Sequence, residues 1–203
     1  IRLPAGWCGV VGFKPSGGRV PIRPPYLGRV AGPITRTVAD AARLMATLSR
    51  PDWRDATSLP PQDIAWEAIE ADPATAVRGL RIGLLLDAGW GLPLDADIAA
   101  AVSAAAREFE RAGAVVVPPS AFTTREMAEG IDLFWRLRSW LDISALPPER
   151  RDRVLPFIRA WAAAADGCSA AALFRGYSQF AALRDAAVAA CQPFDFVLSP
   201  VAP

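Results

Sequence analysis

The chain has 203 residues, of which 52% are hydrophobic and 21% are charged, and its formal net charge is +1 at pH 7. A chain of this length and apolar content can bury a sizeable core, which excludes a disordered tail and fits one domain or a large part of one. The near-zero charge gives no reason to expect nucleic acid or an anionic membrane as a partner, because a phosphate-binding surface usually shows as a basic excess or a basic patch.

Histidine is absent and cysteine is scarce in this sequence. Without histidine, the chain cannot supply a histidine-based catalytic triad or a histidine metal ligand. Cys8, Cys168 and Cys191 are far apart and form no Cys-x-x-Cys motif, so they indicate neither a zinc site nor a disulfide framework. A reducing compartment, the cytoplasm, is therefore the simplest expectation. No apolar run reaches the roughly 18 residues that a membrane-spanning helix needs.

The first stretch, IRLPAGWCGVVGFKPS at 1–16, carries three regularly spaced glycines. Glycine lacks the Cβ that keeps two segments apart, so Gly6, Gly9 and Gly12 predict close packing of backbone on backbone. From the residues alone, the stretch is interpreted as a tight buried loop beside a strand. Four prolines in residues 19–33 then predict an extended or turning path. We favour a plain surface connection there over a rim of a binding site.

A helix is predicted from Val38 to Leu48, where apolar residues recur every three or four positions. Thr35 or Thr37 can cap its beginning, and Pro51 stops it. The next segment mixes proline, aspartate and tryptophan, which indicates an irregular surface excursion with a short helix over 64–71.

Residues 80–118 give the clearest indication of architecture. A strand-length apolar run at 80–86 is followed by an alanine-rich helical pattern at 95–112 and by a second strand at 114–117, with Gly113 placed to end the helix. Such a unit builds parallel sheets through a right-handed crossover. We therefore expect an α/β fold with a mixed, mostly parallel sheet covered by helices on both faces. The DAGWG loop at 87–91 lacks the G-x-G-x-x-G spacing, which argues against nucleotide binding.

The remainder is predicted to be mostly helical. Thr123 or Thr124 caps a helix that runs to about Leu141, and its apolar stripe comprises Met127, Ile131, Phe134, Leu137 and Leu141. Phe134, Trp135 and Trp140 can line an acyl or aryl pocket. An aromatic stripe at helical spacing is more often core, and we favour that interpretation.

Three more elements are predicted after residue 148. A helix begins near Glu149 and is kinked or restarted at Pro156, and Ser169 caps another helix from Ala170 to Cys191. The final run, FDFVLSPVAP, predicts a strand that ends in a proline turn.

Residues 1–21 and 32–48 resemble the amidase signature family of serine amidohydrolases. There the first run reads, roughly, G-G-S-I-R-x-P-A-x-x-C-G-x-x-G-x-K-P, and the second reads G-P-x-x-R-x-V-x-D. The matching positions are Ile1, Arg2, Pro4, Ala5, Cys8, Gly9, Gly12, Lys14, Pro15, Gly32, Pro33, Arg36, Val38 and Asp40. Asp195, Pro200 and Pro203 are similar to a later Asp-x-x-x-x-Pro-x-x-Pro run of the family. Matches of this length, in this order, are specific.

The resemblance also implies what residues 1–203 do not contain. In the family the acylated serine stands directly before the Ile-Arg pair, so its counterpart is the residue preceding Ile1. The bridging serine and the lysine base lie further upstream, and Lys14 does not match that lysine. The resemblance thus makes 1–203 a partial amidase domain, its central to C-terminal portion, without the N-terminal catalytic segment and the extreme C-terminus of the family. It implies that 1–203 has no catalytic residue of its own and no activity in isolation.

The implied reaction is hydrolysis of a small-molecule, non-peptide carboxylic amide to an acid and ammonia or an amine, with no metal or organic cofactor. The implied partner is the N-terminal part of the same protein. Ile1 and Arg2 would support the active site by setting the geometry of the nucleophile. We favour Arg2 as an anchor of the turn, although it can also meet a substrate carboxylate or pair with a carboxylate from upstream. The alternative function is a non-catalytic, amidase-like binding or interaction subunit.

Overall fold

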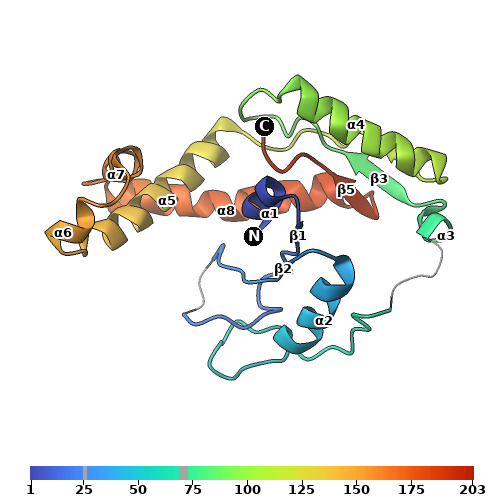
Figure 1. The fold of residues 1–203 in the computed structure, drawn as a ribbon. Coiled ribbons are helices and arrows are strands. Elements are labelled where there is room, and N and C mark those ends of the chain that lie inside the picture. The colour runs from blue at the N-terminus through green and yellow to red at the C-terminus, as the bar shows by residue number, and fades with distance from the viewer. Residues whose placement is uncertain (25–26, 69–72) are drawn as a thin grey trace. The chain divides into compact units, whose positions relative to one another are not determined.

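The computed structural model describes residues 1–24, 27–68 and 73–203, which form two compact units. Unit 1 is residues 1–76 with Ala202, and unit 2 is residues 77–201 with Pro203 (Figure 1).

Unit 1 combines short helices with a two-stranded sheet. Its elements, in chain order, are α1 (Arg2–Cys8), β1 (Val11–Gly12), β2 (Ile34–Thr35) and α2 (Val38–Leu48), and α3 (Pro73–Val77) lies at the boundary with unit 2. Strand β1 pairs with β2 in the antiparallel direction, with Gly12 opposite Ile34. The buried residues of this unit include Met45 and Ala41 of α2.

Residues 2–8 of the first stretch form the helix α1, so the expectation of a tight buried loop was wrong for this part of it. In α1 only Ala5 is buried, and the helix ends at Gly9, whose left-handed backbone (φ 62°, ψ 39°) turns the chain toward β1. Pro4 is compatible with this helix because the N–H groups of the first turn have no partner within a helix, so none is lost. Of the three glycines that suggested a loop, Gly6 therefore lies within α1 and Gly9 ends it.

Helix α2 confirms the predicted helix and selects Thr37 as its cap. Thr37 Oγ1 accepts a hydrogen bond from Asp40 N (3.1 Å) and donates one to Asp40 Oδ2 (2.8 Å). No helix is present in the described part of 19–33, which agrees with the expected extended or turning path. The short helix expected over 64–71 is not found: residues 64–68 form a turn, and the rest of that range lies outside the described residues.

Unit 2 holds a three-stranded parallel sheet with helices on both faces (Figure 1). Its elements are β3 (Arg81–Leu84), α4 (Ala96–Arg111), β4 (Val115–Val117), α5 (Arg125–Ser144), α6 (Pro148–Arg151), α7 (Pro156–Ala163), α8 (Ala170–Cys191) and β5 (Phe196–Leu198). The strand order is β4-β3-β5, and Ile82 lies opposite both Val116 and Phe196. The predicted α/β fold and the predicted parallel pairing are confirmed.

Two helices of unit 2 begin at predicted caps, Thr124 and Ser169, and Asp95, which was predicted only to begin a helix, caps a third. Asp95, Thr124 and Ser169 each accept a hydrogen bond from a backbone N–H in the first turn of α4, α5 and α8. Helix α5 runs to Ser144, past its expected end at Leu141. Pro156 is the first residue of a new helix, α7. Of the two expected outcomes, a kinked helix or a restarted helix, the restart is confirmed. None of the described helices combines the length and apolar character that crossing a bilayer requires.

Helices α5 and α8 pack against each other through a glycine pair. A Cβ added to Gly176 would lie 2.7 Å from Gly130 O, and one added to Gly130 would lie 3.0 Å from Gly176 Cα. The two backbones therefore approach more closely than any side chain would allow. Beside this crossing, α5 is joined to α7 by Asp132, which accepts hydrogen bonds from Arg136 Nε and from Trp161 Nε1 (3.1 Å).

Candidate functional site

Ile1 and Arg2, the expected supports of an active site, lie at the beginning of α1. Ile1 is half-buried, and its carbonyl oxygen accepts the first hydrogen bond of the helix from Ala5 N (3.1 Å). Arg2 is exposed, and among the described residues no carboxylate pairs with its guanidinium. The Ile1 carbonyl is thus bonded into α1, and the Arg2 side chain lies exposed at the beginning of that helix.

Lys14 lies close enough to Arg2 for their charges to interact. Partial burial, and secondly the positive charge of Arg2, lower the pKa of the Lys14 ammonium. Its Nζ donates a hydrogen bond to Pro15 O (3.0 Å).

The three glycines of the first stretch have three different environments. Gly6 is exposed within α1, and Gly9 has a positive φ with no atom within 4 Å of an added Cβ. Gly12 has no positive φ, but an added Cβ would lie 2.5 Å from Ala5 Cβ and 3.1 Å from Ile1 O. The predicted close packing of backbone on backbone is therefore found at Gly12.

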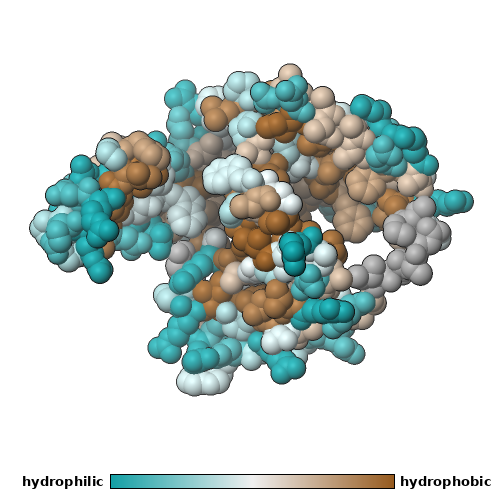
Figure 2. Space-filling model, viewed as in Figure 1, coloured by the Kyte–Doolittle hydropathy of each residue, from teal (hydrophilic) through white to brown (hydrophobic). Residues whose placement is uncertain are grey.

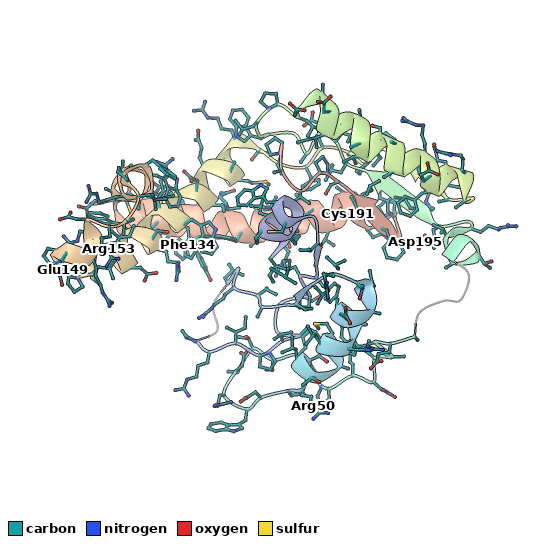
Figure 3. All side chains as sticks on the ribbon, viewed as in Figure 1. Arg50, Phe134, Glu149, Arg153, Cys191 and Asp195 are labelled. Carbon is teal, nitrogen blue, oxygen red and sulfur yellow. The ribbon has the colours of Figure 1, made fainter. Side chains whose placement is uncertain are left out.

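Phe134 and Trp135, the candidate pocket residues, are half-buried on α5 in unit 2. The Phe134 ring, labelled in Figure 3, lies 5.7 Å from Tyr177 and 5.1 Å from Phe180, both on α8. Trp135 meets Phe134 edge-on at 5.4 Å. These are the distances of packed aromatic pairs, so Phe134 takes part in the α5–α8 contact.

An open groove of about 470 Å³ runs between α5 and α8, and sequence reasoning did not find it. Its charged lining comes from Arg125, Glu126, Glu129 and Arg175, and the glycine pair Gly130 and Gly176 forms part of its surface. Phe134 and Trp135 are not among its lining residues. An isolated glycine inside each helical pattern was the available signal, because such glycines often have a packing reason.

Backbone N–H groups of the DAGWG loop after β3 are already used in hydrogen bonds within the protein. Asp87 Oδ1 accepts from Gly89 N (2.8 Å), and Thr123 Oγ1 accepts from Trp90 N (2.8 Å) and lies 2.7 Å from Ala88 O, to which it donates. A phosphate needs such N–H groups free and meets repulsion from a carboxylate. The loop therefore connects the segments after β3 and β4 instead of forming a phosphate cradle.

Asp195, which falls on the later family motif, aligns two strands. Its Oδ2 accepts a hydrogen bond from Arg81 N (2.8 Å), and its own N–H donates to Arg81 O (2.9 Å). Figure 3 shows it at the entrance to β5. Its role in unit 2 is to set the start of β5 beside β3.

The chain belongs to the amidase family, whose pattern matches residues 1–203. It is 41% identical, over 128 residues, to a glutamyl-tRNA(Gln) amidotransferase subunit of Myxococcus xanthus (strain DK1622), a match that covers 59% of this chain and 25% of the relative. Its fold is similar to that of a bacterial aryl acylamidase of the amidase signature family, with a TM-score of 0.79, 28% identity, and coverage of 98% of this chain and 43% of the other.

A native peptide amidase from Stenotrophomonas maltophilia is also similar, with a TM-score of 0.62, 26% identity, and coverage of 95% of this chain and 46% of the other. The chain thus spans a quarter of the length of the amidotransferase relative and less than half of the length of these two solved amidases. The resemblance seen in the sequence is confirmed, and the relatives are amidases and amidotransferase subunits.

Proposed function

We propose that residues 1–203 are the central to C-terminal part of an amidase domain that hydrolyses a carboxylic amide through a serine acyl-enzyme. The observation that carries the proposal is the family match over 1–203, which begins on the Ile-Arg pair of the signature. In the intact protein, the residue directly before Ile1 is then the nucleophilic serine. A bridging serine and a lysine base lie further upstream.

In this mechanism the lysine accepts a proton through the bridging serine, and the nucleophilic serine attacks the amide carbonyl carbon. Backbone N–H groups stabilise the oxyanion, ammonia or an amine leaves, and water then releases the acid. The part of residues 1–203 is to hold the nucleophile in place, because Ile1 is its neighbour and the Ile1 carbonyl is bonded into α1. We propose that Arg2 anchors the same turn; the alternatives are that its guanidinium meets a substrate carboxylate or pairs with a carboxylate from upstream.

Exposed apolar side chains in unit 2 support the proposal that the domain is partial. Phe174 and Val188 on α8 are 71% and 62% exposed, and Phe196 on β5 is 62% exposed. Figure 2 shows hydrophobic surface lying open to solvent. Among the described residues, β4 and β5 each pair on one side only, so both edges of the sheet are open to pairing with further strands. The further chain that the relatives possess would cover these positions.

The proposed substrate is a small, non-peptide carboxylic amide, such as a simple aryl or alkyl amide. The fold similarity to an aryl acylamidase favours this class. We propose Phe134 and Trp135 as one wall of the substrate pocket, since both residues are only half-buried.

The proposed location is the cytoplasm. The three described cysteines are free thiols, which is compatible with a reducing compartment.

The test is to compare the 203-residue chain with the intact protein that includes the residues upstream of Ile1. The intact protein should release aniline from simple anilides or ammonia from simple amides, and the 203-residue chain should show no turnover. Replacing the serine before Ile1 by alanine should abolish turnover in the intact protein. Turnover by the 203-residue chain, or a residue other than serine at that position, would contradict the proposal. The latter result, with amide binding but no hydrolysis, would favour a non-catalytic amidase-like binding protein.

A further inference from the structure

We propose that Gly12 is a positioning residue for the nucleophile, a role that rests on the proposed function above. Gly12 has no Cβ, and this lets β1 pass close beneath the first turn of α1. The turn includes Ile1, which is one peptide bond away from the proposed serine. Gly12 would then act on the reaction through Ile1, without touching the substrate.

The contact is too close for any other residue. An added Cβ would lie 2.5 Å from Ala5 Cβ, 3.1 Å from Ile1 O and 3.4 Å from Ile1 Cγ2. Non-bonded carbon atoms prefer separations of about 3.5–4.0 Å, so the methyl group would have to gain about 1 Å of space. Either β1 or the first turn of α1 must move.

Strand β1 is held from its other side. Gly12 pairs with Ile34 of β2, and Phe13 N donates a hydrogen bond to Pro33 O (3.0 Å). Behind Phe13, Gly32 packs so tightly that an added Cβ there would overlap with Phe13 O. The strand cannot retreat without breaking these contacts.

The beginning of α1 is held less firmly within unit 1. Its last turn is tied to β1 through Gly9 and Val10, with Val10 N donating to Ala5 O (3.0 Å). At the other end, Ile1 is half-buried and Arg2 is exposed. A methyl group on residue 12 should therefore displace the Ile1 end of the helix, and with it the nucleophile.

Other glycines of unit 1 provide matched controls. They distinguish the effect of a crowded Cβ from the effect of a backbone conformation that only glycine adopts easily. Gly9 needs its positive φ but has open space around an added Cβ, and Gly17 has open space and no positive φ. Gly9→Ala should therefore destabilise the helix end without pushing on Ile1, and Gly17→Ala should be neutral.

The experiment compares kcat, KM and Tm for the intact protein and for its Gly12→Ala, Gly9→Ala and Gly17→Ala variants, with an anilide as the probe. A displacement of about 1 Å can lower the rate of a positioned reaction about 100-fold. We therefore expect Gly12→Ala to lower kcat on the order of 10- to 100-fold with KM nearly unchanged. Gly9→Ala should lower Tm with a much smaller change in kcat.

Rescue separates positioning from a general loss of folding. Ala5→Gly removes the closest atom, so the double variant Ala5→Gly/Gly12→Ala should recover most of kcat, with Ala5→Gly alone as its control. The proposal is overturned if Gly12→Ala leaves kcat unchanged, or if the double variant is no better than Gly12→Ala. An inactive intact wild type would instead overturn the proposed function.

The displacement itself can be measured without activity. In the intact protein, Gly12→Ala should shift the NMR amide signals of Arg2 and Leu3, and adding Ala5→Gly to that variant should reverse the shift. Unchanged signals in Gly12→Ala would overturn the proposal even if no substrate is found. Circular dichroism of each variant checks that it is folded.

Discussion

At the scale of single residues, Asp55 links two segments of unit 1. Its side chain is buried, with the residue only 5% exposed, and accepts hydrogen bonds from Ile22 N (2.8 Å), Thr57 N (2.8 Å) and Thr57 Oγ1 (2.6 Å). The bond from the Thr57 hydroxyl, followed by that from the Ile22 backbone, holds the pKa of the Asp55 carboxyl below its ordinary value. The ionised Asp55 carboxylate therefore joins Ile22, in the proline-rich connection at 19–33, to Thr57.

The depressed pKa of Asp55 predicts a pH dependence of stability. A carboxyl whose pKa is lowered by folding stabilises the fold above its unfolded pKa of about 3.9, and this contribution is lost as the pH falls through the lower folded value. Asp55→Asn should therefore lower Tm at pH 7, and the difference from wild type should shrink as the pH falls below about 4. Thermal unfolding followed by circular dichroism between pH 2 and pH 7 measures both effects.

The control for this prediction is Asp63→Asn, because Asp63 is exposed. Hydrogen bonds from Arg54 lower the pKa of the neighbouring Asp52 to about 2, but wild type and variant share that pair, so their difference isolates Asp55. An NMR titration that gave Asp55 an ordinary pKa would contradict the argument.

At the scale of elements, the crossing of α5 and α8 depends on two glycines. The atom closest to an added Cβ on Gly176 belongs to the Gly130 backbone, which cannot move aside as a flexible side chain can. The packing of unit 2 is therefore sensitive to a single methyl group at this point.

Gly176→Ala is predicted to destabilise unit 2 by about 1–3 kcal/mol, because forcing a methyl group between the two helices strains a close-packed contact. In an open helical position the same change would stabilise by about 1 kcal/mol, so the sign of the effect is diagnostic. Urea unfolding measures it, with Gly91→Ala as the control, since Gly91 has open space and no positive φ. A variant as stable as wild type would show that the helices can separate freely.

The elements themselves show what local sequence can predict. Thr37, Thr124 and Ser169 were recognised as candidate caps, since a cap is a hydrogen bond between a side chain and the backbone two or three residues away. Helix α1 was missed because a helix of seven residues is marginal alone, so its glycines outweighed its helix signals. Its contact with Gly12 is not visible in a local pattern.

At the scale of the whole chain, exposed apolar surface predicts how residues 1–203 behave without the rest of an amidase domain. The 203-residue chain should bind the apolar dye ANS and self-associate, and the intact protein should do so much less. Fluorescence titration and analytical ultracentrifugation measure the two effects. The double variant Phe174→Ser/Val188→Ser should bind less dye at unchanged stability, because both side chains are exposed on α8. Equal dye binding by the 203-residue chain and the intact protein would argue against a partial domain.

The candidate site was only partly predictable. Ile1 and Arg2 came from the signature motif, and their connection to α1 required the structure. Phe134 was expected either in a pocket or in the core, and its ring lies among those of Tyr177 and Phe180. The groove between α5 and α8 is lined from 125–133 on one side and from 172–179 on the other, and no periodic pattern predicts a meeting of segments so far apart in the sequence.

The sequence by itself determined the family, the parallel strand–helix–strand unit and the caps of the long helices. Those features depend on motifs and on interactions between residues near each other in the chain. Only the tertiary structure decided that Gly12 is the glycine pressed against Ile1 and Ala5, and that Gly130 meets Gly176. It also decided that residues 2–8 form a helix, because so short a helix is marginal alone and α1 packs through Ala5 against Gly12. The physical reason is the same in each case: the deciding contact is a distance between atoms on separate elements, and that distance exists only after folding.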